Sequence, residues 1–224
     1  MPAVSDAPVV VLSASSASAR QGVGFQWLAG VTIFLGSFLL FQIQPIVAKQ
    51  ILPWFGGSAS VWTTCLLFFQ AVLFFGYVYA HLALVRLPTR FQFVLPAGLL
   101  LASLAALPVL PSVAWKPGGQ EDPIFRILGL LSATVGAPYF LLSATSPLVQ
   151  GWLARRPGAA LPYRFYALSN LASLLALLAY PVLVEPLLAA RTQTYVWSVL
   201  YAVFVVLSIA CAWNGTRSFK AAEV

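Results

Sequence analysis

Residues 34–62, FLGSFLLFQIQPIVAKQILPWFGGSASVW, join one apolar segment to the next through a short polar stretch. Gln42, Gln44 and Lys49 lie within or beside the apolar run. Polar groups placed in hydrocarbon need partners inside the protein. We therefore expect these three side chains to face other helices or a cavity and not the lipid.

The same stretch contains residues that interrupt helices. Pro45, Pro53, Gly56 and Gly57 are predicted to break any continuous helix here. Irregular backbone at membrane depth persists only where protein covers it or where it lines a water-filled cavity. We expect an elbow, for which two interpretations stay open: it lines a cavity between helices, or it is an interfacial loop whose tryptophans lie among lipid headgroups.

The composition is that of an integral membrane protein. Hydrophobic residues make up 61% of the chain and charged residues 8%, and the mean hydropathy is +0.91, whereas roughly a quarter of the residues in a soluble domain are charged. The 224 residues can form several spans of about 20 residues each, but no sizeable soluble domain besides. The basic residues are scattered among short connections, which excludes a nucleic-acid partner.

Six apolar segments are each long enough to cross a bilayer once, which predicts an all-α transmembrane domain over residues 23–214. The segments are residues 25–44, 60–85, 91–113, 123–153, 163–189 and 194–213. We expect residues 1–22 to be a disordered cytoplasmic tail and residues 215–224 a short cytoplasmic tail. A cleaved signal peptide is not expected, because the first basic residue is Arg20.

Prolines make two of the segments irregular. Gly136, Pro138 and Pro147 fall inside the fourth segment, where a kink or partial unwinding is expected. The third segment could end early, at Pro108 or Pro111.

The distribution of basic residues predicts the orientation. With a cytoplasmic N-terminus and six spans, eight of the twelve Lys and Arg residues are on the inner side and four on the outer side. The outer four are Lys49, Lys116, Arg126 and Arg191. Because basic residues are enriched in cytoplasmic loops, we expect both termini to be cytoplasmic, in a multi-pass protein of the cell inner membrane.

Glu185 is the one acidic residue outside the tails and the loop between the third and fourth segments. A carboxylate in hydrocarbon without a partner costs a few kcal/mol or more. We propose an ion pair between Glu185 and Lys49, or a role for Glu185 in attracting a cationic substrate. The alternative is that Glu185 simply ends a helix at the headgroups.

Two further polar clusters lie inside apolar segments. Ser143, Thr145 and Ser146 precede Pro147 and could either bond helices together or contact a substrate. Another set recurs at the helical spacing i, i+3, i+4, i+7 and therefore shares one helix face: Tyr166, Ser169, Asn170 and Ser173. This face should point at another helix, a partner subunit or a cavity.

We find no catalytic set in the sequence. Paired carboxylates with a base, a nucleophile elbow, a phosphate-binding glycine fingerprint and a metal-ligand cluster are all missing from the 224 residues. We therefore expect no enzymatic activity from this chain alone, no cofactor and no metal.

Three strings together resemble the membrane portion of bacterial fused major-facilitator/spermidine-synthase proteins. They are FQIQPIVAKQILPWFGGSASVWTTCLLFFQ (residues 41–70), SATSPLVQGW (residues 143–152) and YRFYALSNLASLLALLAYPVLVEP (residues 163–186). The likeness extends over residues 25–213, and it departs from the family pattern at Ala172, where a glycine is expected. The resemblance implies a six-helix bundle like half of a major-facilitator transporter. We do not expect the 224 residues to contain the synthase-like half of that family, because only residues 214–224 follow the region of resemblance.

Two functions follow as hypotheses. The first is a transporter-like unit for a small molecule, with a polyamine or another cation implied by the resemblance, which pairs with a second copy or another membrane subunit. Its candidate substrate-binding residues are Gln42, Gln44, Lys49, Ser143, Thr145, Ser146, Asn170 and Glu185. The second is a membrane anchor that transports nothing and assembles with a separately encoded, cytosolic synthase-like enzyme.

Overall fold

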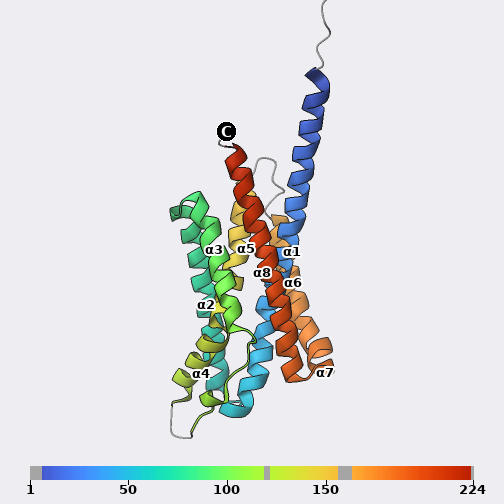
Figure 1. The fold of residues 1–224 in the computed structure, drawn as a ribbon. Coiled ribbons are helices and arrows are strands. Elements are labelled where there is room, and N and C mark those ends of the chain that lie inside the picture. Colours follow the sequence, from blue (N-terminus) through green and yellow to red (C-terminus); the bar gives the residue numbers. More distant parts are fainter. Residues whose placement is uncertain (1–6, 119–121, 156–162, 223–224) are drawn as a thin grey trace, which may run out of the picture.

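The computed structural model describes residues 7–118, 122–155 and 163–222, with side chains placed for residues 24–118, 122–155 and 163–214. This part of the chain forms a bundle of helices without strands (Figure 1). The α-helices are α1 (Ala7–Phe55), α2 (Ala59–Arg86), α3 (Thr89–Ser103), α4 (Pro123–Leu131), α5 (Ala137–Ala154), α6 (Tyr163–Ala179), α7 (Glu185–Leu187) and α8 (Ala190–Ala222). The short helices are the 3₁₀ turns η1 (Leu104–Ala106) and η2 (Val113–Trp115) and the π-helical turns η3 (Ser132–Gly136) and η4 (Tyr180–Val184).

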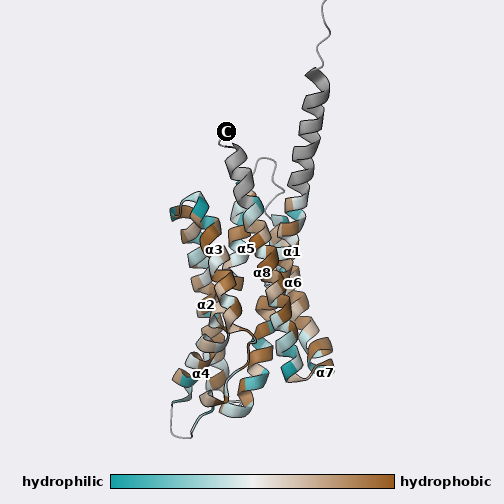
Figure 2. Cartoon of the chain, in the orientation of Figure 1, coloured by the Kyte–Doolittle hydropathy of each residue, from teal (hydrophilic) through white to brown (hydrophobic). Residues whose placement is uncertain are grey.

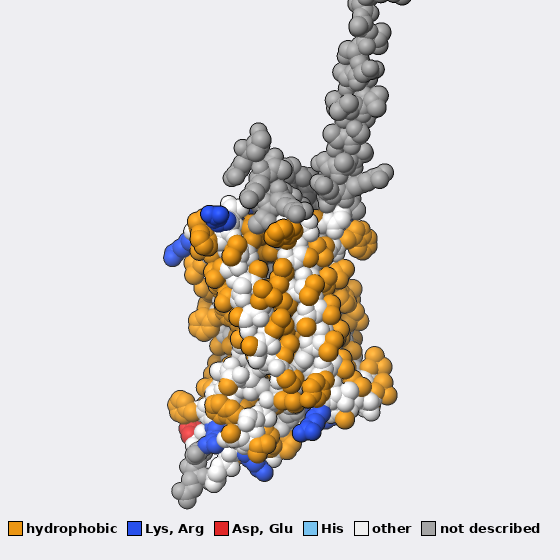
Figure 3. All heavy atoms as spheres, viewed as in Figure 1, with side chains coloured by type: hydrophobic (Ala, Val, Ile, Leu, Met, Phe, Trp, Pro, Cys, Tyr) orange, Lys and Arg blue, Asp and Glu red, His pale blue; other side chains and the backbone are white. Residues whose placement is uncertain are grey.

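These helices give six stretches that are long and apolar enough to cross a membrane, as the sequence predicted. The stretches are Gly24–Phe55, Ala59–Arg86, Thr89–Ala106, Pro123–Ala154, Tyr163–Leu187 and Ala190–Asn214. Hydrophobic residues predominate along the helices (Figure 2). Hydrophobic side chains cover much of the visible face of the bundle, while the visible Lys and Arg side chains lie near its two ends (Figure 3). The chain is a multi-pass membrane protein.

An even number of spans returns the chain to the side on which it started. The beginning of α1 and the end of α8 lie at the same end of the bundle (Figure 1). We call this the tail end. The loop between α3 and α4 lies at the opposite end. Assignment of the tail end to the cytoplasm remains a prediction from the charge count.

The helix breaks expected at Pro45 and Pro53 are wrong, because α1 continues through both residues. The break expected at Gly56 and Gly57 is confirmed, because α1 ends at Phe55 and α2 begins at Ala59. A proline removes one helical hydrogen bond, but in a bilayer every other backbone group still needs an internal partner, and neighbouring helices can satisfy the groups that a proline frees. Tyr180 connects this stretch of α1 to the fifth span by donating its hydroxyl to the carbonyl of Pro45 itself at 3.3 Å. The helix ends one residue before Gly56, whose φ of +81° favours glycine.

The predicted irregularity of the fourth span is confirmed. It consists of α4 and α5, joined by the π-helical turn η3 directly before Pro138, whereas Pro147 lies inside the unbroken α5. The fifth span has a corresponding π-helical turn, η4, which contains Pro181. The third span ends at Ala106. It therefore ends early, near Pro108, and does not extend to residue 113.

Both ends of the chain are more helical than expected. α1 begins at Ala7 and includes residues 7–22, for which a disordered tail was predicted, and α8 continues to Ala222. Between Pro8 and Gly22 the sequence is mainly Ala and Ser with no strong helix breaker, so an established helix can propagate through it. Residues 1–6 and 223–224 of the predicted tails lie outside the described residues.

The long helix α1 lies at the centre of the bundle and packs against α5, α6 and α8. The side of α8 that packs against α1 carries three fully buried aromatic residues: Trp197, Tyr201 and Phe204. The indole of Trp197 donates to the carbonyl of Leu39 at 3.0 Å and stacks on the ring of Tyr201, with centroids 5.2 Å apart. This contact holds α8 against the middle of α1.

Candidate functional site

A polar cavity of about 190 Å³ lies between α1, α2, α5 and α6. Five serines, one asparagine and one tyrosine contribute to its lining. The lining residues are Ser37, Leu40, Phe41, Tyr77, Leu142, Ser143, Ser146, Ser169, Asn170 and Ser173. We call this space the serine cavity.

The serine cavity is at membrane depth. Ser169 and Ser173 lie six and ten residues from Tyr163, the first residue of the fifth span, which is about 9 and 15 Å along the helix at 1.5 Å per residue. The hydrocarbon core of a bilayer is about 30 Å thick. Ser173 is therefore placed near the middle of the bilayer, where polar side chains are costly unless they have partners or a wet cavity to face.

Helix α6 presents a polar face to the cavity. Ser169 and Ser37 of α1 share a hydrogen bond of 2.7 Å between their hydroxyl oxygens, and Ser173 donates to the carbonyl of Ser169 at 3.0 Å. Asn170 is exposed, and its amide has no hydrogen-bond partner within the part of the chain that the structure describes. The predicted polar stripe on this helix thus points partly at α1 and partly into the cavity.

Helix α5 supplies the opposite wall. Ser143 donates to the carbonyl of Phe140 at 2.7 Å, and the hydroxyl of Ser146 accepts a hydrogen bond from the side chain of Gln150 at 3.1 Å. On α2, Tyr77 has 52% of its surface exposed. Because Tyr77 and Asn170 are both exposed, the cavity opens sideways between α2 and α6.

Gln44, Thr145 and Gln42 are not part of the serine cavity. The amide of Gln44 donates to the hydroxyl of Tyr139 at 3.1 Å, and Thr145 donates to the carbonyl of Leu141 in its own helix at 2.7 Å. Both residues therefore have structural partners. Gln42 is 3% exposed and lines a separate small cavity of about 60 Å³ next to α8.

Neither amide atom of Gln42 has a hydrogen-bond partner among the described residues. A buried polar group without a partner costs about 1–3 kcal/mol. We expect Gln42→Met to raise the free energy of unfolding by about this amount, because methionine is of similar size and has no amide to desolvate. Equilibrium unfolding in mixed detergent micelles measures the change.

Gln44→Met is the matched control, two residues away in the same helix. It removes the hydrogen bond to Tyr139, and it should lower the free energy of unfolding by about 1 kcal/mol. Equal destabilisation by the two substitutions would show that Gln42 has a partner after all.

Lys49 and Glu185 form the predicted ion pair, with 3.1 Å between Nζ and Oε1. The side chains are 36% and 49% exposed, so the pair contributes little to stability. Neither residue lines the serine cavity. The carboxylate of Glu185 is therefore engaged by a lysine, away from the candidate substrate site.

Three of the eight predicted site residues thus come together: Ser143, Ser146 and Asn170. Sequence reasoning missed Ser37 and Tyr77 as site residues. Ser37 could have been found as the one hydroxyl between Ile33 and Phe41 in an otherwise apolar stretch. Tyr77 shows no such signal, because aromatic residues recur along α2.

Among the described residues there is no group of three or more His, Cys, Asp or Glu that could hold a metal ion. No family model, curated protein or solved structure matches this chain. The residues of the serine cavity are therefore the basis for a functional assignment.

Proposed function

We propose that this chain is a six-helix transport unit for a small molecule and that the serine cavity is its substrate site. One observation carries the proposal: hydroxyl and amide groups from four helices surround an open volume of about 190 Å³ at membrane depth. If these groups served only to hold the helices together, they would be expected to pair across closed interfaces. A polar cavity within the spans is what a substrate path through a membrane requires.

The lining indicates the chemistry of the substrate. Hydroxyl and amide groups donate and accept hydrogen bonds, and none of the lining residues carries a charge. A polyamine in this cavity would have no counter-charge, since Glu185 is paired with Lys49 elsewhere, and an uncompensated charge is costly in a low-dielectric site. We therefore favour a small uncharged molecule with several hydroxyl or amide groups over the cation that the resemblance suggested.

The sideways opening of the serine cavity supports the proposal that a second subunit covers it. Tyr77 and Asn170 would face lipid in a single chain, and the amide of Asn170 is costly there. A second copy of the chain, or another membrane subunit, would cover the opening and complete an enclosed path. This arrangement agrees with the resemblance to half of a major-facilitator bundle.

Transport by reconstituted vesicles tests the proposal. Uptake of radiolabelled glycerol, urea and spermidine is compared between vesicles with and without the protein. We expect Asn170→Leu to lower uptake of the transported uncharged solute about tenfold, because it removes the free amide and fills part of the cavity. Gln70→Leu removes an exposed amide from α2 outside the cavity, and it should leave uptake unchanged.

Two outcomes would contradict the proposal. One is uptake of all three solutes at the rate of protein-free vesicles. The other is equal uptake by wild type and Asn170→Leu, which would exclude the cavity as the path. Loss of spermidine uptake in Glu185→Gln, with Asn170→Leu unaffected, would instead favour the cation hypothesis.

The anchor hypothesis has one observation in its favour. The beginning of α1 and the end of α8 lie at the same end of the bundle (Figure 1), so a single cytosolic protein could contact both helices. An anchor needs no polar cavity within its spans, so the serine cavity gives transport the stronger support. Recovery of a soluble synthase-like protein with the tagged chain from native membranes, together with no measurable transport, would favour the anchor.

A further inference from the structure

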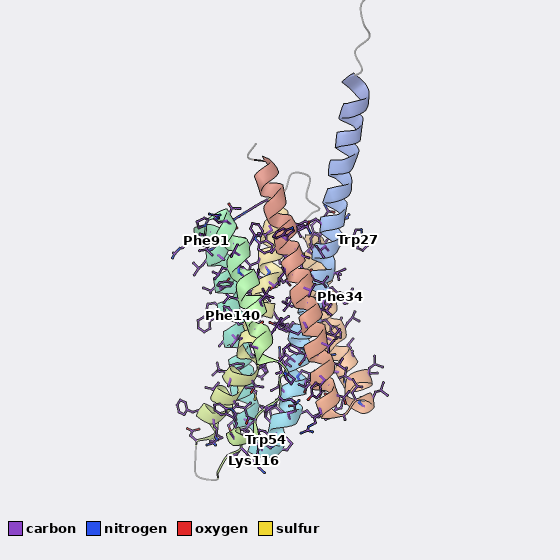
Figure 4. The ribbon with its side chains drawn as sticks, viewed as in Figure 1. Trp27, Phe34, Trp54, Phe91, Lys116 and Phe140 are labelled. Atoms are coloured by element: carbon purple, nitrogen blue, oxygen red, sulfur yellow. The ribbon has the colours of Figure 1, made fainter. Side chains whose placement is uncertain are left out.

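A second, larger concavity lies on the outer surface of the bundle, in the groove between α1 and α6. It has a volume of about 520 Å³. Trp27, Gly30 and Phe34 line it from α1, and Arg164, Phe165 and Leu168 line it from α6. Figure 4 shows Trp27 and Phe34 one below the other along α1. We call this space the α1/α6 groove.

The groove extends along about two-thirds of one bilayer leaflet. Trp27 and Phe34 are seven residues apart, which is about 10 Å along a helix, and one leaflet contributes about 15 Å of hydrocarbon. Trp27 is 73% exposed at the tail end of the bundle, where a tryptophan is typical of the membrane interface. An acyl chain that enters at Trp27 would therefore reach most of the way to the bilayer centre.

The groove owes part of its depth to Gly30. A Cβ atom at this position would lie 3.6 Å from Leu168 Cδ2 and 3.8 Å from Phe165 Cε1, so it would fit without a clash. A longer side chain at position 30 would occupy the space between the two helices. This gives a way to fill the groove without removing a polar group.

The groove has a positive charge at its mouth. Arg164 is exposed in the first turn of α6, and no hydrogen bond or ion pair joins it to another described residue. The first turn of a helix also carries a partial positive charge. A basic group above an apolar groove complements a molecule with an anionic head and an aliphatic tail.

We propose that the α1/α6 groove binds an anionic phospholipid. One acyl chain lies along Trp27, Gly30 and Phe34, and the phosphate contacts the guanidinium of Arg164. The site is on the bilayer-facing wall, where the occupant is a lipid, and the charge of Arg164 selects its headgroup. This inference does not depend on the proposed transport function.

Fluorescence quenching by brominated lipids tests the proposal. The protein is reconstituted in phosphatidylcholine with increasing amounts of phosphatidylglycerol or phosphatidylcholine that carries bromine on its acyl chains. The signal of Trp27 is obtained as the difference between wild type and Trp27→Phe. We expect the phosphatidylglycerol to quench this signal with about fivefold higher affinity, which is the effect of one basic residue near an anionic headgroup.

Three variants separate the groove from general attraction to basic residues. Arg164→Gln should abolish the preference for phosphatidylglycerol, and Arg164→Lys should retain most of it. Arg90→Gln removes a charge at the same end of the bundle but outside the groove, and it should leave the preference intact. Gly30→Leu should weaken quenching by both lipids, because the leucine fills the groove.

The proposal is overturned if the two lipids quench the Trp27 signal equally in the wild type. It is also overturned if Arg90→Gln lowers the preference as much as Arg164→Gln, since the basic tail end as a whole would then attract the lipid. Elution of each variant as a single peak in detergent shows that it is folded. Arg164→Lys keeps the positive charge, so its comparison with Arg164→Gln separates loss of the charge from loss of the arginine side chain.

Discussion

Replacing Trp197 with alanine is expected to lower the free energy of unfolding by about 3–5 kcal/mol. The side chain is 2% exposed, and its removal would leave a cavity between α8 and α1. The substitution also removes the hydrogen bond to the carbonyl of Leu39 and the stack on Tyr201. Unfolding of the purified protein by sodium dodecyl sulfate in mixed micelles measures the loss.

Two substitutions control this prediction. Trp62→Ala removes an indole that is 45% exposed, and it should cost much less than Trp197→Ala. Trp197→Phe keeps an aromatic ring against Tyr201 but loses the donor, so we expect an intermediate cost of about 1–2 kcal/mol. Similar losses for Trp62→Ala and Trp197→Ala would contradict the assignment of Trp197 to the core.

Gly76→Ala is expected to lower the free energy of unfolding by about 1–3 kcal/mol. A Cβ atom at this position would clash with Ser143 Oγ, and it would lie 2.9 Å from Ser143 Cβ and 3.1 Å from the carbonyl oxygen of Phe140. Since the last of these atoms is backbone, α2 and α5 would have to move apart. The same unfolding experiment measures the change, and uptake should fall as well because Ser143 lines the serine cavity.

Gly98→Ala is the matched control for Gly76→Ala. Gly98 lies in α3, and a Cβ atom there would meet no other atom within 4 Å. Because alanine favours helices more than glycine does, this substitution should leave stability unchanged or raise it by up to about 1 kcal/mol. If the two alanine variants were equally stable, α2 and α5 would not approach each other closely at Gly76.

The number of spans and their approximate positions could be predicted from the sequence, because a run of about 20 apolar residues indicates each of them. The first span, however, extends to Phe55, beyond the end predicted at residue 44. The prediction failed where it treated Pro45 and Pro53 as the ends of a helix. That inference holds in water, where a broken helix can bond to solvent, but in a bilayer the rest of α1 is more stable if it remains helical. The low helix propensity of proline therefore predicted the wrong end for α1, although hydropathy located the span itself.

The ion pair between Lys49 and Glu185 was predictable, since few charged residues lie beside apolar segments. The charge count also places Lys49 and the end of the fifth segment, where Glu185 lies, on the same side of the membrane. The candidate site was predictable only in part. Helical spacing placed Ser169 and Asn170 on one face of α6, but it did not show which helix they would meet. Ser37 enters the site through the packing of α1 against α6, which no pattern within either segment specifies.

The two π-helical turns have a mechanical consequence. η3 ends seven residues before Ser143, and η4 begins seven residues after Ser173, so each is separated from the serine cavity by about 10 Å of regular helix. A π-turn is a weak point at which a helix bends without losing its backbone bonds on either side. The fourth and fifth spans can therefore change direction beyond the serine cavity, while the serine-bearing segments keep the regular helical spacing that sets where the lining side chains lie.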